Sequence, residues 1–347
     1  MQQEIEQVPK IVRFEKFGGP EVLKIFEEPL QEPGPGDVRL KVEALGLNRA
    51  EVMLREGKYV TLPQFPARIG IEAAGIVDAV GDGVTEVKVG ERVSAVPFLS
   101  CDEFGNWIPD SVVKYGVYGE SAVVPAWTVA RNPEGTSVID AAAIWCQYLT
   151  AWGGMVDYAG LNKGSIVLVT AASSSAGLGA LQIAKAEGAL TIAATRAATK
   201  RQFLLDAGAN DVIVTDDENL AERIKNITNG QGFTIAYDPV GGPLVGELVE
   251  GAMPCGIIVN YGNLSPDNIN FYVLSMLAKR LTIKSHSLFD TVRDANARER
   301  GQRYVFNGVQ SGALRPIVDS TFPLDEIVES HRYMESNNQK GKIIVTT

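Results

Sequence analysis

Residues that form disulfides or bind metals are scarce in this sequence. Its 347 residues include three cysteines, Cys101, Cys146 and Cys255, and two histidines. An odd number of widely spaced cysteines does not make a disulfide framework. Positive charge is also in deficit, because 42 acidic residues outnumber 32 basic ones and leave a net charge of −10. Nucleic-acid-binding proteins usually present a basic surface, so no nucleic-acid partner is expected, although a local basic pocket for a phosphorylated cofactor is still permitted.

Long apolar runs are absent as well. No run approaches the roughly 20 residues that a membrane-spanning helix needs. The opening residues, MQQEIEQVPK, are polar and lack the apolar core of a signal peptide. We therefore expect a cytoplasmic protein without membrane association. The composition, 45% hydrophobic and 21% charged, is that of a globular protein, and the length favours two domains over one.

The first part of the chain, residues 11–131, consists of short runs of alternating apolar and polar residues that end at turn signals. In DVRLKVEAL the side chains of Val38, Leu40 and Val42 fall on one face. The stretch EAAGIVDAVGDGVTEVKVGERVSAV turns at GDG and again at KVGE. This pattern predicts an antiparallel, barrel-like β domain.

From about residue 164 the pattern changes to apolar strands separated by helix-like segments. Such alternation is typical of a doubly wound parallel sheet, whose two faces are both covered. Six strands match two mononucleotide-binding halves, so the predicted class is α/β, with a Rossmann sheet inserted in the β domain. The expected strands are 165–170, 190–195, 211–214, 233–238, 256–261 and 281–286.

The end of the chain, GKIIVTT, reads as a strand that rejoins the first domain. The domains expected are therefore a β domain over 1–130, a nucleotide-binding domain over 131–287, and a return to the first domain over 288–347.

The stretch TAASSSAGLG lies between the first of these strands and a helix, where a phosphate-binding turn is expected. Ala172, Ser174 and Gly177 stand at the spacing of the usual glycines, so two of the three are replaced by small residues. An ordinary turn with a serine N-cap is the alternative, and the position in the first βα unit favours the cofactor site. The candidate contacts are Ala172, Ser173, Ser174, Ser175, Ala176, Gly177 and Leu178.

The end of the second strand indicates which dinucleotide is bound. An NAD site normally carries an acidic residue there, about 20 residues after the turn, on the ribose 2′-hydroxyl. This chain has Thr195, Arg196, Lys200 and Arg201 in that segment and no acid. Guanidinium and ammonium groups would neutralise a 2′-phosphate, which predicts NADPH. A solvated helix start with scattered basic residues is the alternative.

Several motifs together resemble the medium-chain dehydrogenase/reductase superfamily, and within it the zinc-independent quinone oxidoreductase and enoyl reductase branch. The resemblance implies a GroES-like β domain, a Rossmann domain, an active site in a cleft between them, and a homodimer. It also implies a small-molecule substrate such as a quinone or a CoA or ACP thioester. The motifs are FGGPEVL (17–23), PGPGDVRLKVEALGLNRAE (33–51), GIEAAGIVDAVGDGVTEVKVGERV (70–93), YGESAVVPAWTVARNPEG (118–135), LTAWGGM (149–155), LLDAGANDVI (204–213) and GKIIV (341–345).

The zinc-dependent relatives place their metal ligands, by this resemblance, at positions that here hold Asn48, Ile71 and Cys146. Isoleucine cannot ligate, an amide oxygen is a poor zinc ligand, and one thiolate does not hold a catalytic zinc. No metal is therefore expected, and Cys146 is interpreted as a buried small residue or a substrate contact.

The catalytic candidates are Asn48 and Tyr59, in the segment LNRAEVMLREGKY that resembles the enoyl reductases. The resemblance implies that Asn48 donates an amide hydrogen bond to substrate or cofactor. It implies that Tyr59 donates its phenol to the developing enolate, which suits a side chain with a pKa near 10. The alternatives are a turn residue for Asn48 and a loop aromatic capping the β domain for Tyr59.

Further cofactor contacts are implied by the resemblance or by the rule that ligands bind at the carboxyl ends of parallel strands. Thr150 would lie near the nicotinamide ribose, and Lys342 beside the cofactor phosphates. A helix-interior hydroxyl and a solvated strand-edge lysine are the respective alternatives. The turns after the fourth and fifth strands contribute Gly241, Gly242, Gly262 and Asn263, unless these are plain turn residues.

The segment 98–119 carries Trp107, Tyr115 and Tyr118, which either line the cleft or pack internally. The function expected is NADPH-dependent, metal-free hydride transfer to an activated double bond in a quinone, enone or enoyl thioester. A carbonyl reductase of the same fold, and a non-catalytic NADPH-binding structural or regulatory protein, stay open as alternatives.

Overall fold

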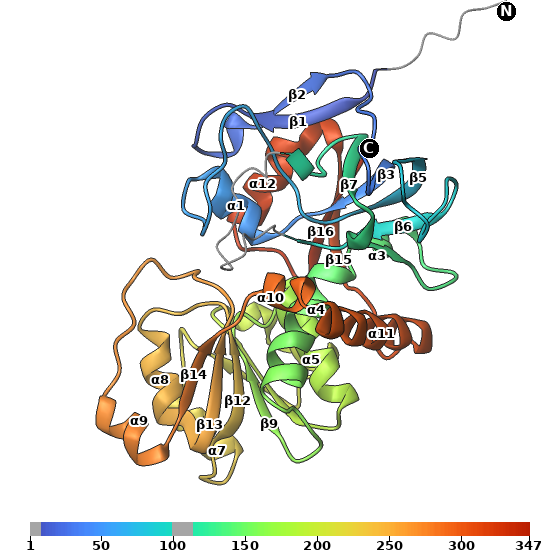
Figure 1. The fold of residues 1–347 in the computed structure, drawn as a ribbon. Coiled ribbons are helices and arrows are strands. Elements are labelled where there is room, and N and C mark those ends of the chain that lie inside the picture. Colours follow the sequence, from blue (N-terminus) through green and yellow to red (C-terminus); the bar gives the residue numbers. More distant parts are fainter. Residues whose placement is uncertain (1–7, 99–113) are drawn as a thin grey trace, which may run out of the picture. The chain divides into compact units, whose positions relative to one another are not determined.

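The structure, a computed structural model, describes residues 8–98 and 114–347 (Figure 1). It divides into two compact units. The first comprises the described residues up to Cys146 together with Val318–Thr347, and the second comprises Gln147–Ile317. No helix in the described part is long and apolar enough to cross a bilayer.

The first unit is built mainly on antiparallel strands, as the alternating sequence predicted, and its last two strands, β15 and β16, pair in parallel. Its main sheet has the order β15-β16-β3-β5-β6-β8, and β7 also pairs with β3. Val38, Leu40 and Val42 of β3 are buried on one face, which confirms the face read from the sequence. The strands are β3 (Asp37–Gly46), β5 (Ala73–Val80), β6 (Arg92–Ala95), β7 (Ser121–Pro125), β8 (Val129–Arg131), β15 (Val318–Pro323) and β16 (Lys342–Thr346).

A smaller sheet of order β2-β1-β4 completes this unit, with β1 (Lys10–Phe14) between β2 (Lys24–Glu27) and β4 (Ala67–Arg68). The C-terminal strand β16 runs antiparallel to β3, with Ile344 opposite Gly46, so the predicted return of the chain is confirmed. The helical segments are η1 (Pro20–Val22), α1 (Arg49–Arg55), η2 (Ala126–Thr128), α3 (Val138–Ala141), η5 (Leu324–Glu326) and α12 (Ile327–Glu335).

The second unit is a parallel sheet of order β11-β10-β9-β12-β13-β14, the order of a Rossmann fold. Its core includes Leu168, Ile192, Phe233 and Ile258, all fully buried, as expected for a sheet covered on both faces. The strands are β9 (Ile166–Val169), β10 (Leu190–Thr195), β11 (Asp211–Val214), β12 (Phe233–Asp238), β13 (Ala252–Asn260) and β14 (Thr282–Ser285).

Helices connect these strands and extend the unit at both ends. They are α4 (Trp145–Ala151), the π-helix η3 (Trp152–Tyr158), α5 (Ser175–Ala186), η4 (Ala198–Lys200), α6 (Arg201–Asp206), α7 (Leu220–Ile227), α8 (Leu244–Gly251), α9 (Val273–Lys279), α10 (Leu288–Arg293) and α11 (Ala295–Ser311).

Both boundaries between the units lie later in the chain than the sequence predicted. Residues 131–146 stay with the first unit because Ala141 and Ala142 pack against Ala44 and Ile344. Residues 288–317 stay with the second unit, since the Tyr304 hydroxyl donates to Glu187 at 2.7 Å. The division falls within helix α4, after Cys146.

Candidate active site

The turn between β9 and α5 has the geometry of a phosphate-binding turn. Ala171 adopts a left-handed conformation with φ of 44°, at a place where glycine is usual. A Cβ atom on Gly177 would lie 2.7 Å from the Cα of Ala172, so only glycine fits where the helix approaches the turn. Ser174 is the N-cap of α5, as the alternative reading proposed, and accepts from the Gly177 amide at 3.1 Å. The first turn of α5 offers amides and a positive dipole end to an anion.

Two of the predicted contacts in this turn differ from expectation. Ala172 is fully buried and its amide donates to the Ala194 carbonyl at 3.1 Å, so that amide is not directed at a phosphate. Leu178 is also buried, in the packing of α5. Ser173, Ser174, Ser175 and Ala176 remain at the turn and at the start of the helix.

The basic residues after β10 are arranged in two different ways. The Lys200 ammonium donates to the Ser173 hydroxyl at 3.1 Å, which brings this lysine to the phosphate turn. Arg196 is exposed and makes no ion pair with any described residue. Arg201, in contrast, binds Glu218 at 2.8 Å and the Val212 carbonyl, and Thr195 is buried. Lys200 is therefore held beside the turn, whereas Arg196 extends into solvent.

The loops after β9 and β12 meet where the strand order reverses, which is where ligands bind in such sheets. The Thr170 hydroxyl donates to the buried carboxylate of Asp238. The same carboxylate accepts from the Gly241 amide at 2.9 Å. Asp238 thus joins the two loops that flank the reversal, a role the sequence analysis missed although this acid ends the fourth strand.

The glycines of these loops are required by their geometry. Gly241 and Gly242 both have positive φ, and a Cβ on Gly242 would lie 2.3 Å from the Ser265 hydroxyl. Gly262 packs against Pro239, and Asn263 is exposed next to it. The loops after β12 and β13 are therefore closely fitted at the carboxyl edge of the sheet.

Thr150 lies near the end of helix α4 and is largely buried. The π-helix that follows brings Gly153 against α10 and the loop before it, where a Cβ would lie 2.2 Å from the Thr291 hydroxyl and 2.9 Å from Nε2 of His286. Burial lowers the pKa of His286 to about 4, so this imidazole is neutral at physiological pH. Such π-helical turns occur often at functional sites.

The first unit contains a buried ion pair between Lys342 and Glu72. The Lys342 ammonium lies 2.6 Å from Oε2 of Glu72 and 2.7 Å from Oδ1 of Asn48, and both charged side chains are fully buried. The other oxygen of Glu72 accepts from the Cys146 amide at 2.8 Å. Gly46 makes room, since its Cβ would lie 2.8 Å from the Lys342 side chain. Burial lowers the pKa of Lys342 and Glu72 raises it, with a net increase, so the ammonium stays charged.

The hydrogen bonds around Glu72 differ from what the sequence predicted for Lys342 and Asn48. Lys342 was expected beside the cofactor phosphates, but its ammonium is enclosed by Glu72 and Asn48 within the first unit. Asn48 was expected to donate to substrate, but its Nδ2 donates to the Gly46 carbonyl at 2.9 Å while its Oδ1 accepts from Lys342. Both polar atoms of this amide are thus used inside the protein.

A second buried carboxyl, that of Glu51, lies close to this pair. Glu51 accepts from the Tyr118 hydroxyl at 2.5 Å and from the amides of Asn48 and Ile71 at 2.7 and 2.9 Å. Burial raises the pKa of Glu51 to about 7, against the opposing effect of these donors. Neither Glu51 nor Glu72 was identified from sequence. The Glu51 spacing, three residues after a helix N-cap, is the signal that could have found it.

Tyr59 follows helix α1 and is half-buried. Burial raises its pKa well above the usual value, and the nearby Cys146 and Glu51 raise it further. Its hydroxyl makes no hydrogen bond within the described ranges. The phenol is therefore a protonated donor whose hydrogen-bonding capacity is not used by those residues.

The positions that match the zinc ligands of the metal-dependent relatives converge around Glu72. The side chains there are the amide of Asn48, the hydrocarbon of Ile71 and the thiol of Cys146, and the Lys342 ammonium already occupies the acceptors. A buried cation beside a single thiol does not fit a zinc ion, which needs several anionic or imidazole ligands. No group of three or more His, Cys, Asp or Glu side chains suited to a metal occurs in the described ranges.

The aromatic residues of segment 98–119 separate into different environments. Tyr118 is fully buried and bonded to Glu51, so it packs internally and does not line a cleft. Tyr115 accepts from the Lys114 ammonium at 2.6 Å. Trp107 and Cys101 lie outside the described residues.

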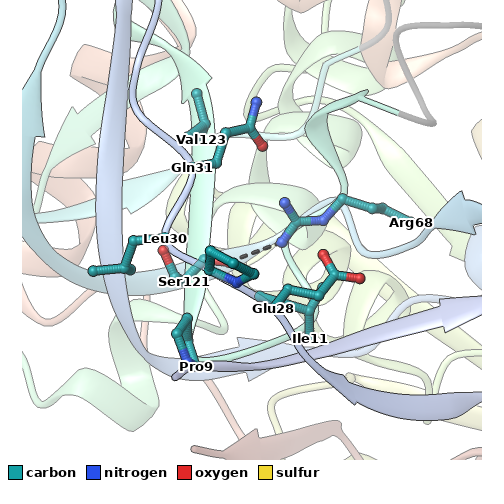
Figure 2. Close-up of a pocket in the computed structure, with 9 residues that line it drawn as sticks. Pro9, Ile11, Glu28, Leu30, Gln31, Arg68, Ser121 and Val123 are labelled. Atoms are coloured by element: carbon teal, nitrogen blue, oxygen red, sulfur yellow. Dashed lines mark hydrogen bonds between the residues drawn. The ribbon is translucent and has the colours of Figure 1, made fainter. Parts of the chain in front are cut away.

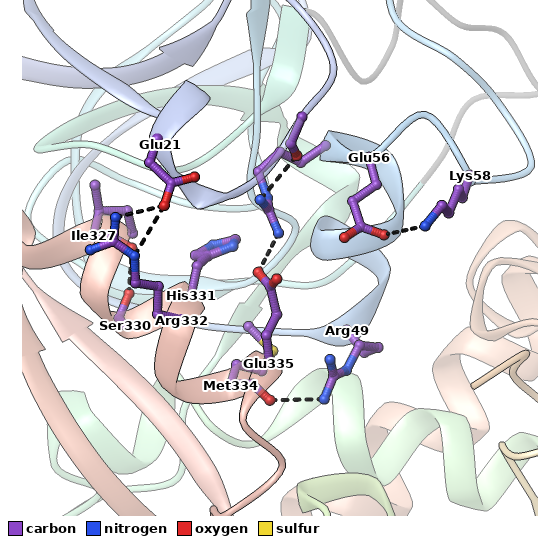
Figure 3. A network of polar contacts seen from close by, with 12 residues as sticks. Glu21, Arg49, Glu56, Lys58, Ile327, Ser330, His331, Arg332, Met334 and Glu335 are labelled. Atoms are coloured by element: carbon purple, nitrogen blue, oxygen red, sulfur yellow. Dashed lines mark hydrogen bonds and ion pairs between the residues drawn. The ribbon is translucent and has the colours of Figure 1, made fainter. Parts of the chain in front are cut away.

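A polar network connects α12 to the rest of the first unit (Figure 3). The fully buried guanidinium of Arg55 binds Glu335 and donates to the Gly18 carbonyl at 3.1 Å. His331 lies on the same helix, and its Nε2 is 3.4 Å from the Tyr118 hydroxyl. Burial and the two nearby arginines, Arg55 and Arg49, lower the pKa of His331 to about 3. The imidazole is therefore neutral and structural.

Figure 2 shows a crevice next to the small sheet, where Arg68 donates to the Ser121 carbonyl at 2.8 Å and Glu28 lies beside it. Its volume is about 20 Å³, room for one water molecule. This crevice is too small for a nicotinamide or a quinone, so it is not a candidate cofactor or substrate site.

Comparisons with known proteins cover both units. Family models match residues 34–134 ("Alcohol dehydrogenase GroES-like domain") and 207–345 ("Zinc-binding dehydrogenase"). Human quinone oxidoreductase is 29% identical over 346 residues, covering 98% of each chain. The Escherichia coli quinone oxidoreductase structure complexed with NADPH has a TM-score of 0.87 and 29% identity, covering 97% of this chain and 100% of that one. An NAD-dependent alcohol dehydrogenase structure has a TM-score of 0.89 and 28% identity, covering 97% and 99%.

Proposed function

Because the chain belongs to the medium-chain dehydrogenase/reductase superfamily, in its quinone oxidoreductase branch, we propose that it is an NADPH-dependent reductase of activated double bonds. The substrate class is a quinone, an enone or an enoyl thioester. The observation that carries the proposal is the phenol of Tyr59, half-buried, protonated and without a partner among the described residues.

The cofactor proposed is NADPH. The Lys200 ammonium on Ser173 and the exposed guanidinium of Arg196 favour a ribose 2′-phosphate over a free hydroxyl. The first turn of α5 receives the pyrophosphate, and Gly177 allows its close approach. The E. coli quinone oxidoreductase, whose structure is complexed with NADPH, supports this choice.

When bound, the cofactor supplies a hydride to the electron-poor carbon of the substrate. The charge that develops on the conjugated oxygen needs a hydrogen-bond donor, and Tyr59 provides one. Its raised pKa keeps the phenol protonated at neutral pH and makes it a weak acid, so Tyr59 acts as a hydrogen-bond donor to that oxygen, and water supplies the proton of the reduced product. We propose that Asn48 and Glu72 support this site from within the protein, because the amide of Asn48 is bonded to the Gly46 carbonyl and to the Lys342 ammonium.

We propose that this chemistry proceeds without a metal. Reduction of a conjugated system places charge on an oxygen that hydrogen bonds alone can stabilise. The donor set around Glu72, with the Lys342 ammonium in it, does not suit a divalent ion. Metal analysis of the purified protein should find less than stoichiometric zinc, and dialysis against a chelator should leave the turnover rate unchanged.

We also propose a homodimer formed through the second unit. Strand β14 is at the edge of its sheet, and α9 and its preceding loop expose large apolar side chains. An apolar surface of this kind marks an interaction site. The side chains concerned are Leu264, Ile269, Tyr272, Val273, Leu274 and Leu277. Light scattering should report a dimer for the native chain and a monomer after Leu274→Asp with Leu277→Asp.

The test of function is steady-state NADPH oxidation with 1,2-naphthoquinone, crotonyl-CoA and a simple enone, each compared with the corresponding saturated ketone. Turnover with the conjugated compounds alone supports the proposal. Turnover with the ketone alone would assign a carbonyl reductase. Tight NADPH binding without turnover of any of them would assign a binding protein and contradict the proposal.

A further inference from the structure

The ion pair of Lys342 and Glu72 joins segments that are distant in the sequence. Lys342 begins β16, Asn48 is the N-cap of α1, Glu72 precedes β5, and Cys146 lies in the first turn of α4. Three hydrogen bonds of 2.6 to 2.8 Å connect them in one chain of contacts. The ammonium therefore fixes the starts of both helices.

Stability alone does not explain this pair. Replacing a buried ion pair by neutral side chains of similar volume is often neutral or stabilising, because both charges lose their hydration. Nor does the pair add a positive field to the site, since the charges of Lys342 and Glu72 cancel. What the pair supplies is a set of directed hydrogen bonds at a defined point.

Helix α1 leads to Tyr59, the donor of the proposed reaction. From Asn48, α1 runs to its C-cap Glu56, and the amides of Gly57 and Lys58 donate to the carbonyls of Leu54 and Met53 at 3.1 and 2.8 Å, directly before Tyr59. A shift at the start of α1 is thus carried to Tyr59.

We propose that Lys342 is a positioning residue, which orients Tyr59 through Asn48 and α1. This inference rests on the proposed function for the role of Tyr59. It replaces the contact with cofactor phosphates that the sequence predicted for Lys342.

The test is Lys342→Met, assayed below its melting temperature, with Lys41→Met as the control because Lys41 is an exposed lysine of β3. We expect kcat to fall by about 10-fold to 100-fold, the effect of a small misplacement of reacting groups. The Kd for NADPH, measured by fluorescence, should change by less than about threefold, because the phosphate contacts lie elsewhere. Amide hydrogen exchange should accelerate in peptides covering 47–55 and 144–150 and stay unchanged in 175–186.

A second variant, Asn48→Ala, leaves the ion pair of Lys342 and Glu72 in place and removes the hydrogen bond from Lys342 to Asn48. It should accelerate exchange in 47–55 and not in 144–150. Unchanged kcat and exchange in Lys342→Met, with only a lower melting temperature, would overturn the proposal. A rise in the Kd for NADPH of more than about 10-fold, with unchanged exchange, would instead assign a direct cofactor contact. If the native chain turns over no acceptor, the proposed function fails, while exchange and NADPH binding still decide the role of Lys342.

Discussion

The ammonium of Lys342 and the carboxylate of Glu72 lie 2.6 Å apart with no exposure to solvent. Removing one partner leaves the other charge buried without compensation. We therefore expect Lys342→Met to lower the free energy of unfolding by about 3–5 kcal/mol, and Lys342→Met with Glu72→Gln to restore most of it. Urea denaturation of the single and double variants measures both values. A double variant no more stable than the single one would contradict the assignment of the cost to a stranded carboxylate.

Tyr59→Phe removes the phenol and keeps the ring. If Tyr59 stabilises the developing oxyanion by a hydrogen bond, kcat should fall by about 10²–10³-fold. The Kd for NADPH should stay unchanged, because the cofactor groups assigned to binding lie in the second unit. Stopped-flow measurement of NADPH oxidation, combined with a fluorescence titration, separates these effects. An unchanged kcat would remove Tyr59 from the mechanism.

Arg196→Ala should raise the KM for NADPH by about 10-fold or more, the scale of a charge-assisted hydrogen bond, and leave the KM for NADH unchanged. Arg223→Ala is a suitable control, since this arginine binds Glu218 and Asp211. Equal use of NADH and NADPH by the native chain would show that the basic segment after β10 does not bind a 2′-phosphate.

Glu51→Gln tests the raised pKa of the buried carboxyl. The native group holds its proton up to a pKa of about 7, whereas the unfolded group loses it near 4.5. Between these values the folded state binds more protons, so this group's contribution to stability falls as the pH rises. The melting temperature of Glu51→Gln relative to the native chain should therefore increase from pH 4.5 to pH 7. His331 acts in the opposite sense below pH 6.5, since its folded pKa is lowered, and it is present in both proteins. If the difference in melting temperature between Glu51→Gln and the native chain did not change with pH, Glu51 would be ionised throughout this range.

Gly177→Ala places a methyl group 2.7 Å from backbone atoms of Ala172, which cannot move cheaply. We expect a loss of about 1–3 kcal/mol in stability, together with weaker NADPH binding. Gly164→Ala, where the nearest atom is 3.3 Å away, is the control. Calorimetry and a binding titration of both variants provide the comparison.

The sequence was sufficient to predict the two architectures, because alternation and short apolar runs report which faces are buried. Val38, Leu40 and Val42, and the strands from β9 to β14, lie where the pattern placed them. The C-terminal return was also predictable. The boundaries were not, since packing of Ala141 on Ala44 depends on contacts between distant segments.

The turn after β9 was identified correctly as a structural feature, but its individual contacts were not. Which of Ala171 and Ala172 becomes left-handed is decided by the hydrogen bond of Ala172 to β10. Lys342 resembled a surface cation because sequence spacing does not reveal that Gly46 leaves space for a buried side chain. Glu72 and Asp238 were missed because their importance lies in partners that are remote along the chain.

The division within helix α4 affects where the chain can be cut into fragments or joined in chimeras. Domain boundaries usually fall in exposed linkers, but here the cut after Cys146 passes through hydrogen-bonded helix, and the amide of Cys146 is held by Glu72. A fragment starting at Gln147 would begin in mid-helix with an exposed, frayed end. Chimeras that exchange nucleotide-binding halves between relatives should therefore be joined before Trp145. Glu72 and Lys342 should both come from the same relative.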